Sequence, residues 1–170
     1  MEKILAQARK VAEEAEVFLV SAEETPVQFE ANRLKNVQGK QSTSVALRII
    51  KNGRLGYATG TDVADVQSLV ENAVETAKFG TRARFELPPA TPYPKVDIFD
   101  PAVESASVEK MARLGEELIA LITGHTPEIV CEAEVEKETF TLRIINSRGG
   151  QASYKKSIFS IGVVGNLIRG

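Results

Sequence analysis

The sequence predicts an α+β fold made of two units, each with mainly antiparallel strands and flanking amphipathic helices. The first observation behind this prediction is Asn52-Gly53, which lies between two β-rich runs. Both central residues of a type I′ hairpin turn need positive φ, which Asn and Gly tolerate best. The second observation is that helical and two-residue periodicities occur in both halves of the chain. The third is a run of prolines between the halves, which favours an extended connector.

These observations divide the chain into three consecutive parts. Residues 1–80 are expected to form an N-terminal unit of a helix, four strands and a helix. Residues 81–106 are expected to form a proline-rich connector. Residues 107–170 are expected to form a helix plus three strands, truncated at the C-terminal end, because an apolar strand runs to the last residues without a polar segment.

The first unit begins with apolar positions at helical spacing, which predict a helix over about residues 3–15. Strands are expected over Glu16–Ala22 and Pro26–Leu34, the second of them with alternating apolar and polar side chains. The hairpin about Asn52-Gly53 follows, and its turn fixes the register of the two strands. The expected opposed pairs are Ile50 with Leu55, Ile49 with Gly56, Arg48 with Tyr57 and Leu47 with Ala58.

The second helix of this unit should begin after Asp62, a good N-cap residue. Gly80 lies where a left-handed C-terminal cap belongs. Between them, apolar residues recur at helical spacing and predict one buried face. This apolar seam contains Val66, Leu69, Val70, Ala73, Val74 and Ala77.

The second unit should open with a helix that has Ser107 as its N-cap and ends at Gly124. A strand with clean two-residue alternation follows, and one of its faces is apolar while the other carries glutamates. The apolar face contains Ile129, Cys131, Ala133 and Val135. We therefore expect the apolar face to pack against the helix.

Two turns are expected after this strand. A two-residue turn at Lys137-Glu138 would let Thr139–Ile145 pair back onto the alternating strand. The glycine-rich stretch Asn146–Gly150 would form the second turn and lead into a long strand near Gln151–Val164.

The composition is typical of a soluble globular protein, with 43% hydrophobic and 26% charged residues. The net charge of -2 gives no drive toward phosphate backbones or anionic lipid, so neither direct nucleic-acid binding nor membrane binding is expected. The N-terminus lacks the features of a signal peptide. Cys131 is the only cysteine, which excludes an internal disulfide and favours the cytoplasm.

No catalytic or metal-binding residue is predicted in this chain. A zinc site needs three or four well-placed ligands, whereas His125 is the only histidine and Cys131 falls on the core face of its strand. We interpret them as a histidine in a surface turn and a buried small side chain. Ser147 has no histidine in reach that could activate it as a nucleophile.

The row of glutamates on the alternating strand has two interpretations, a cation site or a solvated strand face. This row contains Glu128, Glu132, Glu134 and Glu136. Two-residue spacing along one strand favours the solvated face, balanced by neighbours such as Arg143, Lys155 and Lys156.

A series of turn and strand residues occurs in the order found in the N-terminal region of TldD/PmbA proteins. The family's hairpin often has the form G-x-x-x-R-x-x-x-[ND]-G-x-x-G, and here Ser44 replaces the leading glycine. A later strand of the family ends in Asn-Ser-x-Gly. The matching residues, for which we expect a structural role, are Arg48, Asn52, Gly53, Gly56, Asn146, Ser147 and Gly149. The sequence thus resembles this family over nearly its whole length.

The resemblance implies a function for a longer parent protein. The resemblance implies a zinc metallopeptidase with a His-Glu-x-x-x-His helix in the C-terminal half. Members of the family are also labelled modulators of DNA gyrase. The implied function of this chain is the N-terminal, non-catalytic portion of such a peptidase, truncated before the metal-binding domain. No cofactor is implied for the chain itself, and zinc is implied for the parent. The implied partners are a peptide substrate, the C-terminal domain of the same protein, and a second subunit in a homodimer or a heterodimer.

An alternative function from a different class stays open. The parent would lack the metal motif, as PmbA-type partner subunits do, and this region would be a scaffold or a partner-binding module. Residues beyond Gly170 that contain, or lack, His-Glu-x-x-x-His would discriminate between the two functions. The sequence given therefore leaves open whether the parent is an enzyme.

Overall fold

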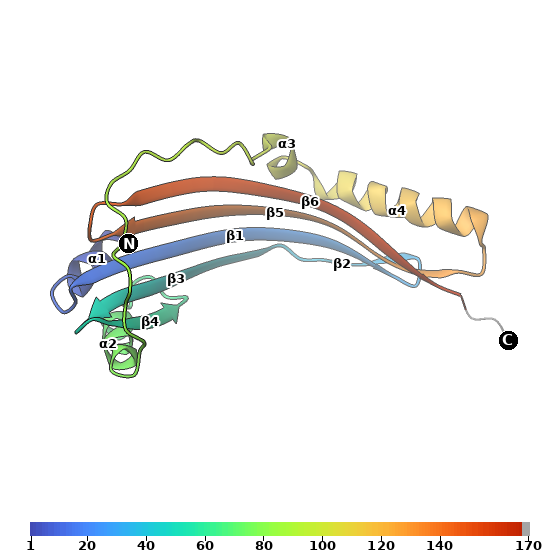
Figure 1. The fold of residues 1–170 in the computed structure, drawn as a ribbon. Helices are drawn as coiled ribbons and strands as arrows, with labels where there is room; N and C mark the ends of the chain where they lie inside the picture. The colour runs from blue at the N-terminus through green and yellow to red at the C-terminus, as the bar shows by residue number, and fades with distance from the viewer. Residues whose placement is uncertain (168–170) are drawn as a thin grey trace. The chain divides into compact units, whose positions relative to one another are not determined.

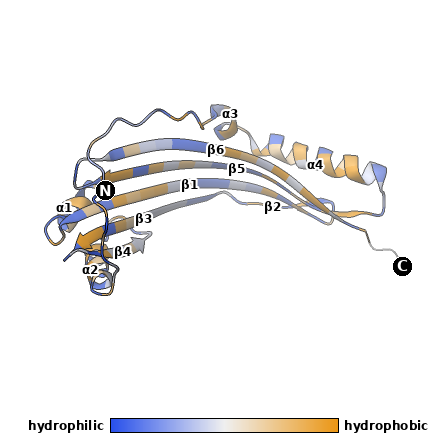
Figure 2. Ribbon diagram, viewed as in Figure 1, coloured by the Kyte–Doolittle hydropathy of each residue, from blue (hydrophilic) through white to orange (hydrophobic). Residues whose placement is uncertain are grey.

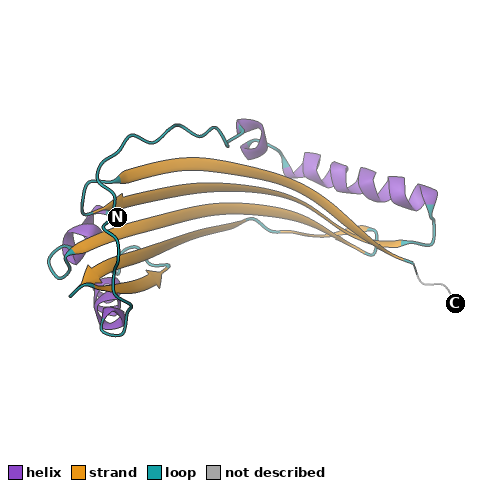
Figure 3. Ribbon diagram, in the orientation of Figure 1, coloured by secondary structure: helices purple, strands orange, loops and turns teal. Residues whose placement is uncertain are grey.

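The computed structural model describes residues 1–167. Figure 1 labels the helices and strands in chain order, and Figure 3 separates the two element types by colour. The elements are α1 (Glu2–Ala8), β1 (Glu14–Glu30), β2 (Arg33–Val37), β3 (Lys40–Lys51), β4 (Arg54–Gly60), α2 (Val66–Ala77), α3 (Pro101–Glu104), α4 (Val108–His125), β5 (Val130–Asn146) and β6 (Gln151–Asn166).

The strands of the described residues form one six-stranded antiparallel sheet, which confirms the predicted α+β class. Its strand order is β4-β3-β1-β5-β6, and β2 pairs with β1 outside this path. The first 80 residues contain a helix, four strands and a helix in this order, but two of the expected strands are one strand and β2 was not expected. The bounds of several elements differ from the prediction.

Two compact units make up the chain, and each is assembled from three separated segments. Unit 1 contains Met1–Ser21, Ser42–Asp97 and Thr141–Lys155, and unit 2 contains Ala22–Gln41, Ile98–Phe140 and Lys156–Gly170. The predicted consecutive parts, 1–80, 81–106 and 107–170, do not coincide with these units. The difference arises because β1, β3, β5 and β6 each contribute residues to both.

The core of unit 1 lies between one face of its strands and the helices α1 and α2. Alternate side chains of β1 and β3, including Val17 and Leu47, are almost completely buried there. The apolar seam of α2 supplies the opposing side, with Leu69, Val70, Ala73 and Ala77 buried. The predicted buried face of this helix is therefore confirmed.

The β3–β4 hairpin has the predicted register and turn. Ile50 opposes Leu55, Ile49 opposes Gly56, Arg48 opposes Tyr57 and Leu47 opposes Ala58. Asn52 has φ of 50° and Gly53 has φ of 68°, as a type I′ turn requires.

The first helix is shorter than predicted, because α1 ends at Ala8 and β1 begins at Glu14. Turns continue after Ala8, where the Ala12 N–H donates to the Ala8 carbonyl at 3.0 Å, and hydrogen bonds to the β3–β4 hairpin then direct the segment into β1. The backbone N–H of Glu13 donates to the carbonyl of Ile50 at 2.9 Å, and Lys51 Nζ donates to the carbonyl of Val11 at 2.5 Å. Tertiary hydrogen bonds thus override the helical periodicity of the sequence.

Both predicted caps of α2 are wrong. Asp65 is the N-cap and accepts a hydrogen bond from the Ser68 N–H at 3.1 Å, whereas Asp62 accepts one from Ala64 in a preceding turn. The helix ends at Ala77, and its C-cap residue Lys78 has right-handed geometry. Gly80 has no positive φ, and its carbonyl instead accepts a hydrogen bond from Arg54 at 2.8 Å.

Unit 2 contains a second core, between α4 and the strand segments of that unit. Cys131, Ala133 and Val135 are at most 5% exposed, as the predicted alternation requires. Ser107 caps α4 as predicted, and its Oγ accepts a hydrogen bond from Lys110. Figure 2 shows hydrophobic and hydrophilic positions alternating along this helix. Its predicted end at Gly124 is wrong by one residue, since α4 includes the exposed His125.

The predicted turn at Lys137-Glu138 is wrong, because β5 continues without interruption from Val130 to Asn146. Neither Lys nor Glu favours the positive φ of a two-residue turn. Lys137 Nζ instead donates hydrogen bonds to the carbonyls of Glu104 and Ala106, at 3.0 and 2.6 Å. The expected pairing of Thr139–Ile145 with the alternating strand is therefore absent.

The first two predicted strands are likewise one strand, β1, which includes Pro26. The turn that sequence reasoning missed is Ala31-Asn32, where φ is 49° and 65° and the chain reverses into β2. Asn32 stabilises this turn, because its Oδ1 accepts the Cys131 N–H at 2.6 Å and its Nδ2 donates to the Ile129 carbonyl at 3.0 Å.

The described helices include none that is long and apolar enough to cross a lipid bilayer.

Gly56 is the point of closest approach between β4 and α2, which yields the first prediction. A Cβ atom there would lie 2.1 Å from the Ala73 carbonyl oxygen and 2.8 Å from the Ala77 Cβ. Gly56→Ala should destabilise the protein by about 1–3 kcal/mol, because backbone cannot move aside cheaply. Gly162→Ala is the matched control, since a Cβ at that strand position meets no atom within 4 Å. Equal urea midpoints for the two variants would contradict this account.

Candidate functional site

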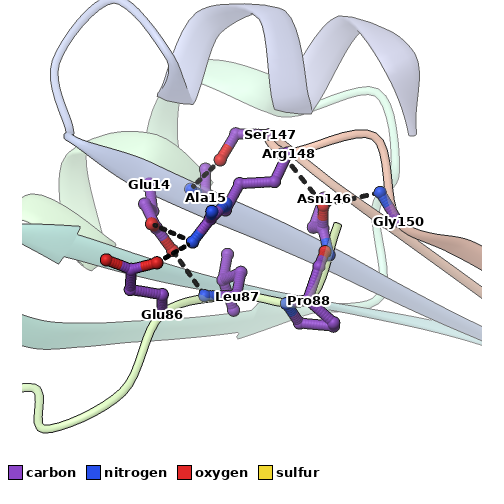
Figure 4. A network of polar contacts seen from close by, with 9 residues as sticks. All are labelled: Glu14, Ala15, Glu86, Leu87, Pro88, Asn146, Ser147, Arg148 and Gly150. Atoms are coloured by element: carbon purple, nitrogen blue, oxygen red, sulfur yellow. Dashed lines mark hydrogen bonds and ion pairs between the residues drawn. The ribbon is translucent and has the colours of Figure 1, made fainter. Parts of the chain in front are cut away.

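A network of polar contacts surrounds the turn between β5 and β6, and Asn146 lies at its centre (Figure 4). Asn146 is 6% exposed. Its Oδ1 accepts the backbone N–H groups of Arg148 and Gly150, both at 2.9 Å, and its Nδ2 donates to the Pro88 carbonyl at 2.9 Å. This buried amide is therefore well satisfied, and it joins the turn to the chain segment that follows α2.

Ser147 connects the same turn to the start of β1. Its backbone N–H donates to the Ala15 carbonyl at 2.8 Å, and its Oγ accepts the Ala15 N–H at 3.0 Å. Ser147 thus satisfies both backbone groups of a fully buried residue. Its hydroxyl is engaged with the backbone, and no general base contacts it among the described residues.

Arg148 adds an ionic contact at the outer side of the turn. Its guanidinium pairs with Glu86 and lies 3.7 Å from Glu14. The hydrogen bond and charge of Glu86 raise the pKa of Arg148, and the charge of Glu14 acts in the same direction. The other oxygen of Glu14 accepts the Leu87 N–H at 2.7 Å. The turn, the start of β1 and residues 86–89 are therefore tied together.

Arg48 lies in the same unit but in a different contact group. Its Nη2 is 2.6 Å from Glu16 Oε1, and its guanidinium lies 5.3 Å from the centre of the Phe85 ring. The Glu16 pair joins β3 to β1, and the Phe85 contact holds the start of the connector against these strands. The predicted signature residues all fall in unit 1.

The structure brings only part of the predicted set together. Asn146, Ser147 and Gly149 share the β5–β6 turn, whereas Asn52 and Gly53 form the β3–β4 turn. Sequence reasoning missed Glu14, Glu86, Arg148, Leu87 and Pro88, which complete the network. No local signal identifies them, because their partners are far away in the sequence.

The described residues contain no group of three or more His, Cys, Asp or Glu side chains that could hold a metal ion. His125 is exposed at the end of α4, and Cys131 is completely buried in the core of unit 2. This donor set does not fit the three or four ligands of a zinc site. The site around Asn146 can anchor backbone, and its described residues include no activated nucleophile.

Three glutamates of the row, Glu132, Glu134 and Glu136, lie on β5, whereas Glu128 lies in the turn before it. Gln28 Nε2 donates to Glu134 at 2.7 Å. Arg143, expected to balance the row, instead lies 3.5 Å from Glu2. Burial, followed by the charges of Glu138, Glu134 and Glu24, raises the pKa of Glu136.

Comparison with known proteins finds one matching family model. Residues 15–77 match the model described as PmbA/TldA metallopeptidase domain 1. The match confirms the resemblance to the N-terminal region of TldD/PmbA proteins. An uncharacterized protein of Methanocaldococcus jannaschii is 26% identical over 169 residues, which are 96% of this chain and 38% of that protein.

Solved structures with the same fold come from several organisms. TldE from Thermococcus kodakarensis has a TM-score of 0.81 at 16% identity, covering 97% of this chain and 42% of that one. A proposed modulator of DNA gyrase from Bacteroides thetaiotaomicron has a TM-score of 0.82 at 14% identity, covering 95% and 39%. At these identities the likeness shows the fold. The chain spans about two fifths of the length of these relatives.

The Asn146 network yields a second prediction. Asn146→Ala should destabilise the protein by about 2–4 kcal/mol, because two N–H groups and one carbonyl lose the buried amide that they bind. Asn72→Ala, at an exposed position of α2, is the control and should be neutral or slightly stabilising. Thermal and urea unfolding measure both variants. A loss below about 1 kcal/mol for Asn146→Ala would show that water replaces the amide.

The raised pKa of Glu136 yields a third prediction, on pH dependence. Because the folded-state pKa lies above the unfolded one, folding favours the protonated carboxyl, and stability falls as pH rises from the unfolded to the folded pKa. Glu136→Gln should therefore raise the urea midpoint at neutral pH and leave it unchanged in acid. The gain should be about a few tenths of a kcal/mol, since water screens the partly exposed row. Glu117→Gln on α4 is the exposed control, and an equal gain there would contradict the assignment.

Proposed function

We propose that this chain is the N-terminal, non-catalytic portion of a TldD/PmbA-type metallopeptidase. The full-length protein would hydrolyse unfolded or small peptides at a zinc site outside this chain. The observation that carries the proposal is the match of residues 15–77 to the first domain of that family.

The role of this portion would be to position the remainder of the peptidase and its substrate. The network around Asn146 supports such a role, because it holds strand ends and connector with backbone hydrogen bonds that involve no catalytic group. The C-terminal domain, a peptide substrate and a second subunit are the proposed partners, in a homodimer or a heterodimer with a related subunit. We place the parent in the cytoplasm.

The alternative is a scaffold or partner-binding subunit without a metal motif, as in the PmbA branch. The two functions predict different motifs in the full-length parent. The proposal expects a His-Glu-x-x-x-His motif there, together with zinc-dependent cleavage by the full-length protein. Absence of the motif, with activity only after addition of a related subunit, would support the alternative.

The fourth prediction concerns the 170-residue chain itself. Dialysed against zinc, it should retain far less than one equivalent of metal and should not cleave unfolded peptides, because its donor set is incomplete. Metal analysis and a peptide assay with and without chelator measure both properties. The full-length protein, and its variant with the first motif histidine replaced by alanine, are the matched controls. Stoichiometric zinc with chelator-sensitive cleavage by the 170-residue chain would overturn the proposal.

A further inference from the structure

The tip of the β3–β4 hairpin contains the sequence pair that is chemically most reactive toward deamidation. Asn52 is the only one of six asparagines that precedes a glycine. Glycine has no side chain to hinder attack by its own backbone nitrogen on the preceding amide. Both residues are exposed, and a Cβ at Gly53 would meet no atom within 4 Å. Neither burial nor steric crowding therefore protects this pair.

The carboxylate of Glu13 contacts the two backbone N–H groups of this turn. Its Oε1 accepts the Asn52 N–H at 2.7 Å, and its Oε2 accepts the Gly53 N–H at 3.1 Å. The Gly53 nitrogen is the atom that must lose its proton and attack during deamidation. A carboxylate at this position opposes loss of that proton and holds the nitrogen in its own hydrogen bond.

Glu13 is itself fixed, and the hairpin tip is held from a second side. The Glu13 N–H donates to the Ile50 carbonyl at 2.9 Å, which places the carboxylate beside the turn. The Ala83 N–H donates to the Gly53 carbonyl at 2.9 Å. Rotation of the Asn52–Gly53 peptide would break contacts on both sides. All of these residues belong to unit 1.

We propose that Asn52-Gly53 is a site of deamidation and that the Glu13 carboxylate slows this reaction in the folded protein. In the reaction, the Gly53 nitrogen loses its proton to solvent and bonds to Asn52 Cγ, while Nδ2 takes up a proton from water, the Cγ–Nδ2 bond breaks and ammonia leaves. The succinimide that forms takes up one water molecule and opens to aspartate or isoaspartate. The co-reactant is water, and no group is oxidised or reduced.

The modification has a structural consequence that differs between its two products. Aspartate tolerates the left-handed turn but adds a charge beside Glu13. Isoaspartate inserts one more carbon atom into the main chain, which a two-residue turn cannot accommodate without loss of register. Because Gly56 on β4 approaches α2 so closely, a change of register would disturb the core of unit 1.

The fifth prediction measures the rate of deamidation at each asparagine by peptide mapping and isoaspartate quantification after incubation at mildly alkaline pH. Glu13→Ala should accelerate reaction at Asn52 by about tenfold or more relative to the parent, as expected for loss of charge-assisted hydrogen bonds. Glu13→Gln should accelerate it less, since its amide oxygen accepts one hydrogen bond. Exposed Asn36 is the internal standard, and its rate should not change. Gly53→Ala in the Glu13→Ala background should suppress reaction at Asn52.

Global unfolding is distinguished from local opening by a second destabilised protein. Asn146→Ala weakens the same unit without touching the hairpin tip, so at matched stability its rate at Asn52 should stay below that of Glu13→Ala. The urea-unfolded parent gives the unprotected limit. Equal rates at Asn52 in the parent and Glu13→Ala, or equal rates in the two destabilised proteins, would overturn the assignment of Glu13 as the protecting group.

Discussion

The buried side-chain amide of Asn146 is the constraint on which the organisation of unit 1 depends. A buried amide needs hydrogen-bond partners. The oxygen of Asn146 accepts hydrogen bonds from the N–H groups of Arg148 and Gly150, and its nitrogen donates one to the Pro88 carbonyl. Ser147 then pairs with Ala15 as a further strand residue would. This short turn therefore fixes the end of β5, the start of β6, the start of β1 and the path of the connector.

Sequence signals predicted the parts of the fold in which a residue acts on its immediate neighbours. Asn52-Gly53 specifies its turn by backbone geometry alone, and Ser107 caps α4 through a residue three positions away. Predictions were wrong where distant contacts decide. Glu13 is drawn out of the first helix by Ile50, and Lys137 continues β5 where a turn was expected. At Glu13 a long-range hydrogen bond outweighed the helical periodicity, whereas Lys137-Glu138 has no local preference for a tight turn and Lys137 bonds to Glu104 and Ala106 instead.

The candidate site divides in the same way. Asn146, Ser147 and Gly149 could be identified because glycine-rich turns with Asn and Ser have a recognisable local chemistry. Glu14 and Glu86 could not be identified, because no local sequence pattern indicates which arginine a glutamate pairs with in the folded protein. Two-residue alternation places Cys131 on a core-facing side of its strand, so the sequence pattern alone argues against this thiol as a metal ligand.

The chemistry of this portion is best understood through what its polar groups already bind. The side chains of Asn146 and Ser147 form hydrogen bonds with backbone groups, and the side chain of Arg148 pairs with carboxylates. A hydroxyl or amide used in this way is oriented and desolvated for anchoring, whereas catalysis needs a group left free to meet substrate. The same rigidity that suits these residues to hold strands and connector in place thus argues that hydrolysis, in the parent that we propose, is performed by other residues.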